Sequence, residues 1–167
     1  IFTTDHGFYF GEHGGMFGKL NQAPKRSKEG YRMWAHSPFY EEVIANPLLI
    51  YVPGSEPGFY AGLTSAIDLA PTVLDLLELD APRFMDGRSL VPVTKDVSVD
   101  GPEFVVSGPP LANEGTVVSW IDDNRRLVAH HSTATVTTTE WTLLYATERG
   151  LSELYHLPSD PKQENNV

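Results

Sequence analysis

The pattern of apolar and polar positions divides the 167-residue chain into two parts. In the first part, residues 1–4 and 47–52 are continuous apolar runs, which are typical of strands buried on both faces. The second part has short β-type runs separated by Gly, Pro, Asn and Asp, which indicates a small antiparallel sheet. These runs are residues 103–106, 116–121, 126–130, 141–145 and 153–156.

Residues 68–79 have the period of an amphipathic helix. Apolar residues recur at i, i+3, i+4 and i+7, which gives one apolar face to a helix. Asp68 is suited to the N-cap or the first turn, where an acidic side chain satisfies free amides, and Pro71 fits the first turn as well. The apolar face consists of Ala70, Val73, Leu74 and Leu77.

These patterns predict an α/β fold. We expect part of a mixed sheet flanked by helices over residues 1–100, followed by a small antiparallel-sheet subdomain over residues 101–167. Residues 5–37 are rich in Gly and charge and are expected to form a long, mostly irregular loop, which in compact domains is usually functional or disordered. The Thr-rich residues 133–139 are expected at a hairpin tip, and the polar residues 159–166 on the surface.

The composition narrows the classes of partner. A formal net charge of −10 argues against nucleic acid and anionic membranes, because Lys and Arg supply the attraction to phosphate. No apolar run approaches the length that spans a bilayer. The absence of Cys excludes disulfides and thiolate zinc sites within this chain but leaves the cellular compartment open. Residues 19–32 hold five of the twelve basic residues. This segment is either a solvated loop or the rim of an anion-binding crevice.

Candidate chemistry follows the first apolar run, where Asp5-His6-Gly7 is succeeded by Gly11-Glu12-His13-Gly14. Side chains at the carboxyl end of a buried strand lie in the ligand crevice of an α/β enzyme. Asp5 and His6 can both reach one cation there; a carboxylate suits a hard cation and an imidazole a softer one, so the residue types leave the metal open. The alternative is ordinary turn chemistry.

The order of several motifs resembles the second half of the sulfatase family, within the alkaline phosphatase superfamily. The resemblance runs from residue 1 to residue 166, with His156 where the family has Asp, and the first strand begins with no lead-in. It implies that the chain is a carboxyl-terminal piece of a larger enzyme. The motifs are TTDHG (3–7), GEHG (11–14), Gly18-Lys19, YEE (40–42) before PLLI (47–50), DLAPT (68–72), DGRSL (86–90) and ELYHL (153–157).

The resemblance also implies roles for residues. It implies calcium bound by Asp5 and His6, with two further Asp ligands from the amino-terminal half, and a sulfate contact from Lys19, for which Lys25 and Lys28 are rivals. An ammonium group suits a sulfate or phosphate oxygen. His13 can protonate the leaving-group oxygen or can buttress the loop through hydrogen bonds.

The nucleophile of the resembled family is missing from this sequence. Sulfatases attack with a formylglycine made from Cys or Ser in a C/S-x-P-x-R motif. The chain has no Cys, and Ser107 is followed by Pro109 but by Leu111 where Arg is required. We therefore expect an inactive piece of a sulfuric ester hydrolase, whose partners are a sulfated small molecule or glycan and the missing amino-terminal half.

Three other functions stay open. The first is a phosphodiesterase or phosphonate monoester hydrolase of the same superfamily, which shares this half and differs in its nucleophile. The second is a non-catalytic module that binds a sulfated glycan. The third is a purely structural domain.

Overall fold

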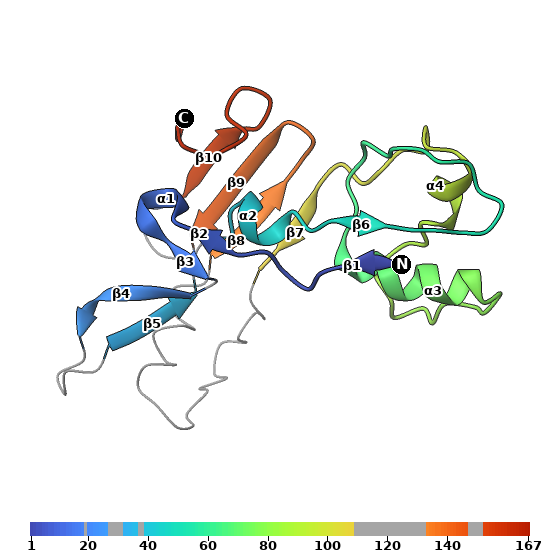
Figure 1. Ribbon diagram of the computed structural model, residues 1–167, viewed down its shortest axis with the longest axis horizontal. Helices are drawn as coiled ribbons and strands as arrows, with labels where there is room; N and C mark the ends of the chain where they lie inside the picture. Colours follow the sequence, from blue (N-terminus) through green and yellow to red (C-terminus); the bar gives the residue numbers. More distant parts are fainter. Residues whose placement is uncertain (19, 27–31, 37–38, 109–132, 147–151) are drawn as a thin grey trace. The chain divides into compact units, whose positions relative to one another are not determined.

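The computed structural model describes residues 1–18, 20–26, 32–36, 39–108, 133–146 and 152–167, and side-chain positions are described for most of these (Figure 1). The chain folds into two compact units. The first unit combines residues 1–5 and 47–105, and the second combines residues 6–46 and 106–167. In this division residues 6–46 group with the carboxyl-terminal sheet. The expected domain boundary near residue 100 stays a prediction. Within the described ranges, no helix is long and apolar enough to cross a membrane.

The first unit pairs the two apolar runs of the sequence. Strand β1 (Phe2–Thr3) lies antiparallel to strand β6 (Leu48–Leu49), with Phe2 opposite Leu49 (Figure 1). The expectation that these segments are neighbouring strands of one sheet is confirmed. The expectation of burial is wrong for this chain, because Phe2 is 64% exposed and Leu49 60% exposed. A two-stranded sheet has too few neighbours to cover its apolar side chains.

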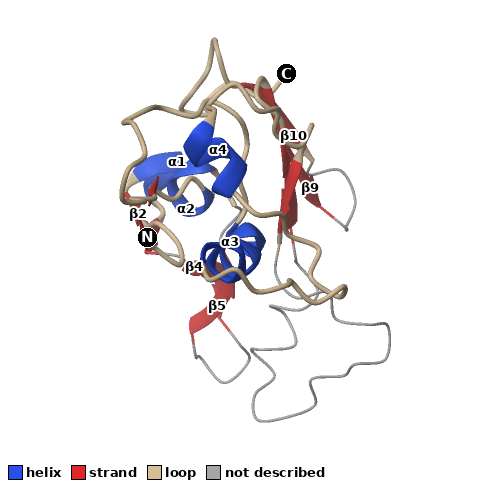
Figure 2. Cartoon of the chain, turned by 90° about the vertical axis from the view of Figure 1, so that its right-hand side faces the viewer, coloured by secondary structure: helices blue, strands red, loops and turns tan. Residues whose placement is uncertain are grey.

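The predicted helix is present but shorter. A 3₁₀ turn, η1 (Ala66–Asp68), leads into α3 (Leu69–Leu76), which Figure 2 draws among the blue helices. Asp68 is the acidic residue of the first turn, as predicted, and its carboxylate accepts the Ser65 amide at 2.9 Å in a capping box, in which Ser65 is the N-cap of η1. The apolar pattern continues past Leu76, but Glu78 has a φ of 57°. A left-handed residue ends the helix regardless of the period.

The segment DGRSL packs against the start of this helix and acts as scaffold. The Arg88 amide donates to the Asp68 carboxylate at 2.9 Å, and that carboxyl-bearing residue is only 4% exposed. A Cβ atom at Gly87 would lie 2.0 Å from the Ile67 carbonyl oxygen, so only glycine fits this approach. Leu90, 2% exposed, then precedes helix α4 (Val91–Lys95).

The second unit contains the predicted small antiparallel sheet, with strand order β10-β9-β8-β7. The Thr-rich segment is strand β8 rather than a hairpin tip, and the turn lies at residues 138–140. The predicted runs 116–121 and 126–130 lie outside the described residues. The strands are β7 (Val105–Ser107), β8 (Thr133–Thr137), β9 (Trp141–Ala146) and β10 (Glu153–His156).

The prediction of one irregular loop over residues 5–37 is wrong, because short hairpins occupy much of it. Strands β2 and β3 pair antiparallel on either side of a helical turn, and β4 pairs antiparallel with β5. These strands were missed because they are short and their partners lie within the same Gly-rich segment. The elements are β2 (Tyr9–Phe10), α1 (Glu12–Gly15), β3 (Phe17–Gly18), β4 (Leu20–Arg26), β5 (Arg32–His36) and α2 (Glu41–Ile44).

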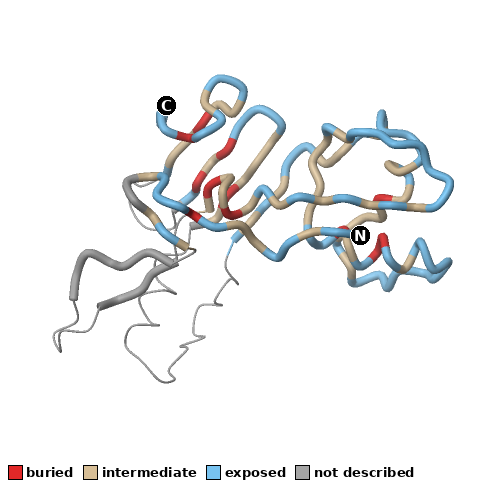
Figure 3. Tube along the Cα trace, in the orientation of Figure 1, coloured by how far each residue is buried: buried red, intermediate tan, exposed pale blue. Residues whose placement is uncertain are grey.

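The core of the second unit joins strand β2 and helix α2 to the four-stranded sheet, and Figure 3 draws its buried positions in red. It consists of Tyr9, Tyr40, Val43, Leu144 and Tyr155. The polar residues 159–166 were expected on the surface, but Gln163 is buried. It is 1% exposed, and its side-chain oxygen accepts the Glu41 amide at 2.8 Å. The oxygen of this buried amide group is satisfied by a backbone partner, whereas the buried Nε2 atom has no hydrogen-bond partner among the described residues.

Candidate functional site

Gly7 allows helix α2 to lie against the Asp-His-Gly segment. The Gly7 amide donates to the Val43 carbonyl at 2.9 Å. A Cβ atom at position 7 would lie 1.9 Å from the Glu42 carbonyl oxygen, closer than any side chain tolerates. The glycine is therefore required for a close backbone approach, whereas the sequence suggested a sharp turn.

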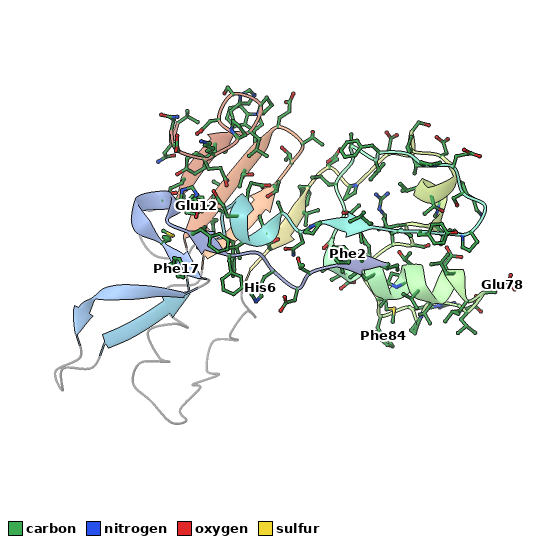
Figure 4. All side chains as sticks on the ribbon, viewed as in Figure 1. Phe2, His6, Glu12, Phe17, Glu78 and Phe84 are labelled. Carbon is green, nitrogen blue, oxygen red and sulfur yellow. The ribbon has the colours of Figure 1, made fainter. Side chains whose placement is uncertain are left out.

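His6, which is labelled in Figure 4, is half-buried in the second unit. Its Nδ1 lies 2.9 Å from the Gly7 carbonyl oxygen, which can only accept, so Nδ1 carries the proton. The lone pair of the neutral ring is then on Nε2. A metal-binding histidine typically has this arrangement, with one ring nitrogen donating to a backbone carbonyl.

Asp5 belongs to the first unit, where it is exposed. It precedes His6 directly, as the sequence requires. Among the residues that the structure describes, no three His, Asp or Glu side chains lie close enough together to hold a metal ion. The expected cation ligands Asp5 and His6 therefore stay a prediction.

His13 is held on two sides within the second unit. Its Nε2 lies 3.0 Å from the Glu42 carboxylate, and its side chain is 7% exposed. Its ring stacks on Tyr40, with centroids 3.7 Å apart and planes 6° from parallel. A φ of 49° adds backbone strain, which persists only where the surroundings fix a residue.

The carboxylate of Glu153, on strand β10, holds Tyr40 of this stack through a hydrogen bond. Glu153 accepts the Tyr40 hydroxyl at 2.6 Å and the Tyr155 hydroxyl at 2.7 Å. Burial, and then the hydrogen bond to Glu153, raise the pKa of Tyr40 far above its usual range and that of Tyr155 to about 12. Both phenols therefore stay protonated and continue to donate at any physiological pH.

Glu12 fixes the loop between the two histidines (Figure 4). Its carboxylate accepts the Phe10 backbone amide. Hydrogen bonds from backbone amides, its own first and that of Phe10 next, lower the pKa of Glu12. The carboxylate therefore stays ionised, and it serves the loop rather than a reacting group.

The predicted sulfate contact, Lys19, lies outside the described residues, as does its rival Lys28. Lys25 lies on strand β4. The residue that the sequence did not assign is Glu42, the partner of His13, which was taken as part of a helical scaffold motif. No local pattern signals this role, because His13 and Glu42 are 29 positions apart.

Comparison with known proteins gives the family. Residues 30–103 match the family model described as N-sulphoglucosamine sulphohydrolase, C-terminal. The N-acetylglucosamine-6-O-sulfatase of Bacteroides thetaiotaomicron is 28% identical over all of this chain and 26% of its own length. A putative sulfatase structure from the same species has a TM-score of 0.68 at 21% identity, over 98% of this chain and 30% of that one.

A third similarity shows how widely this fold is shared. The phosphonate monoester hydrolase of Silicibacter pomeroyi has a TM-score of 0.67 at 22% identity, over 95% of this chain and 28% of that one. The fold is therefore the α/β fold of sulfatase-like hydrolases. These matches support a carboxyl-terminal portion of a sulfatase-family protein, to which the chain is similar. It spans about a quarter of the length of the curated relatives that it matches.

Proposed function

We propose that the chain is the carboxyl-terminal part of a sulfuric ester hydrolase, and that it supplies metal and sulfate contacts to an active site completed by the rest of the protein. Asp5 and His6 would be two ligands of a divalent cation, and Lys19 would bind the sulfate group. The observation that carries the proposal is the His6 tautomer, because the contact with Gly7 leaves the lone pair on Nε2.

The donor types fit a divalent cation but not equally well. Asp5 offers a carboxylate oxygen, which Ca²⁺ prefers, while the His6 imidazole also suits softer ions. Calcium normally takes six to eight oxygen ligands, so most of the expected set belongs to other parts of the protein. When bound, such a cation neutralises charge on the nucleophile and on the sulfate oxygens.

For His13, the contacts favour the second of its two expected roles. Its Nε2 is directed at Glu42 and its ring is enclosed by the Tyr40 stack, so it buttresses the loop that carries His6. The proposal that it protonates the leaving alcohol predicts a change in the alkaline limb of the pH–rate profile when His13→Gln is made. A purely structural role predicts lower stability and an unshifted profile.

The metal proposal is tested in the complete protein with Asp5→Asn and His6→Gln. We expect each variant to lose bound divalent metal, measured by elemental analysis, together with turnover of p-nitrophenyl sulfate. Asp80→Asn serves as the control, because Asp80 is an exposed carboxylate that follows helix α3. Full metal content in both site variants would contradict the proposal.

The sulfate contact is tested by comparing three lysines. Lys19→Ala should lower turnover far more than Lys25→Ala or Lys28→Ala, since one preorganised donor to a transferred anion is worth about 2–4 kcal/mol. The loss of a rim charge mainly changes the rate of association. Equal, small effects from all three variants would show that the lysine was assigned wrongly.

The substrate class is proposed as a sulfated glycan or small molecule. Support comes from the relative named as an N-acetylglucosamine-6-O-sulfatase. The second candidate, phosphonate monoester or phosphodiester hydrolysis, is favoured by the fold that the chain shares with the phosphonate monoester hydrolase. Comparing kcat/KM for p-nitrophenyl sulfate and for p-nitrophenyl phenylphosphonate separates the two, because the preferred ester shows the larger value.

A further inference from the structure

We propose that Phe8, Phe10 and Phe17 form an aromatic subsite that stacks against the ring of the substrate, a pyranose or an aryl ring that carries the ester group. The inference rests on the proposed function, since it assigns the non-sulfate part of the substrate to the surface beside His6.

The hairpin presents its rings outward in a regular alternation. Phe10 is 75% exposed and Phe17 72% exposed, while Tyr9, between Phe8 and Phe10 in sequence, is 1% exposed. Phe10 and Phe17 are register partners on β2 and β3, and their rings meet edge to face with centroids 6.1 Å apart. Cross-strand partners share one face of a sheet, so the two rings form one surface.

The backbone beneath these rings is well fixed. The Gly11 amide donates to the Met16 carbonyl at 2.9 Å, and the Phe10 amide donates to the Glu12 carboxylate. The Tyr9 hydroxyl accepts the Tyr40 amide at 3.2 Å, which ties the hairpin to the core. Rigid aromatic side chains on a fixed backbone lose little conformational entropy when a ligand covers them.

The aromatic surface is continuous with the proposed cation site. Phe8 is 49% exposed and its ring centroid lies 5.2 Å from that of His6. A Cβ atom at Gly18 would lie 3.8 Å from the Phe8 ring, so this ring extends from His6 to the end of β3, where Gly18 follows Phe17. An ester whose sulfate contacts a cation at His6 would therefore place its ring against the phenylalanines.

The chemistry of the surface selects a ring. An aryl group offers a π face and a pyranose offers an apolar C–H face, and either one covers a phenyl ring over a large area. A short alkyl chain covers much less. Because the three side chains are uncharged, they do not repel the anionic sulfate group, whereas the carboxylates of this acidic chain would.

The test uses the complete protein and three sulfate esters: p-nitrophenyl sulfate, glucosamine-6-sulfate and ethyl sulfate. Phe17→Ala should lower kcat/KM about tenfold for the two ring esters, the size expected for one lost aromatic stack, and less than about twofold for ethyl sulfate. Phe17→Trp should keep the ring preference. The aryl and the pyranose ester, compared with each other, identify which ring the subsite prefers.

Phe84→Ala is the matched control, since Phe84 is 81% exposed in the other unit. Thermal unfolding provides a readout besides turnover. Equal losses for all three esters together with a lower Tm would overturn the inference, because they would show that Phe17 packs against another part of the protein. Unchanged kcat/KM for the ring esters would overturn it as well.

Calorimetric binding separates this inference from the proposed function. If the wild-type protein hydrolyses none of the esters but binds p-nitrophenyl sulfate, and Phe17→Ala weakens that binding about tenfold, the subsite stands and the hydrolase proposal fails. If the wild type hydrolyses all three and Phe17→Ala behaves as Phe84→Ala does, the subsite fails and the hydrolase proposal stands.

Discussion

The close approach of Gly7 to helix α2 gives the sharpest prediction from the structure. Replacing Gly7 by alanine would place a Cβ atom 1.9 Å from the Glu42 carbonyl oxygen. Either α2 or the Asp-His-Gly segment must move by roughly 1 Å to relieve that contact. This movement would break the hydrogen bond from the Gly7 amide to the Val43 carbonyl, which is 2.9 Å long.

The cost follows from these two losses. Forcing one methyl group into a well-packed site typically costs about 1–3 kcal/mol, and a lost hydrogen bond adds about 1 kcal/mol. We therefore expect Gly7→Ala to destabilise the second unit by about 2–4 kcal/mol. This is a large fraction of the stability of a typical domain.

The assay is native-state hydrogen exchange of the complete protein, because unfolding of a multidomain protein is not a two-state process. Amides of α2, such as that of Ala45, which donates to Glu41 at 2.8 Å, should exchange at least about 30-fold faster in the variant. Gly108→Ala is the control, because its Cβ would meet only Ala134 at an ordinary 3.7 Å. Similar exchange in both variants would refute the reasoning.

Three further outcomes are expected. His13→Gln and Glu42→Gln should each destabilise the second unit. A double-mutant cycle of these two substitutions should show a coupling free energy of about 0.5–3 kcal/mol. Purely additive effects would contradict the 3.0 Å contact between the two side chains. Burial, and then the charge of Glu42, raise the pKa of Glu41, so folding binds a proton there and stability falls as pH rises from about 4 through the raised pKa. Glu41→Gln should therefore raise Tm at pH 7 but not at pH 3, and an equal change at both would contradict this. Gly87→Ala should lower the Tm of the first unit, because its Cβ would lie 2.0 Å from the Ile67 carbonyl oxygen, and an unchanged Tm would exclude that approach.

The sequence predicted elements whose signal is local. Helix α3 has its own apolar period, and strand β10 (Glu153–His156) has the predicted bounds. Strands β1 and β6 fall in the two apolar runs from which strands were predicted, whereas the register of Phe2 with Leu49 comes from the structure. Fold class could be predicted for this reason, since it depends on the type and order of elements more than on their ends.

The remaining features depend on contacts between distant residues. Gln163 is buried because it bonds to Glu41, which is 122 positions away, and no local pattern shows that. The hairpin of β2 and β3 has two-residue strands, too short for an alternation to be recognised. In the candidate site, both the close approach of Gly7 to Glu42 and the pairing of His13 with Glu42 needed the fold. The metal and sulfate contacts came from resemblance and stay predictions.

The central claim is that this chain supplies contacts to a sulfatase active site but not the nucleophile. It is tested most directly by measuring p-nitrophenyl sulfate hydrolysis by the isolated 167-residue chain and by the complete protein, with and without divalent metal. The isolated chain should show no turnover and only weak metal binding, because electrostatic stabilisation cannot act without an attacking atom held in place. It should also associate with itself through exposed apolar strands such as β1, where Phe2 is 64% exposed. The complete protein should show metal-dependent turnover. Metal-dependent turnover by the isolated chain would contradict the account.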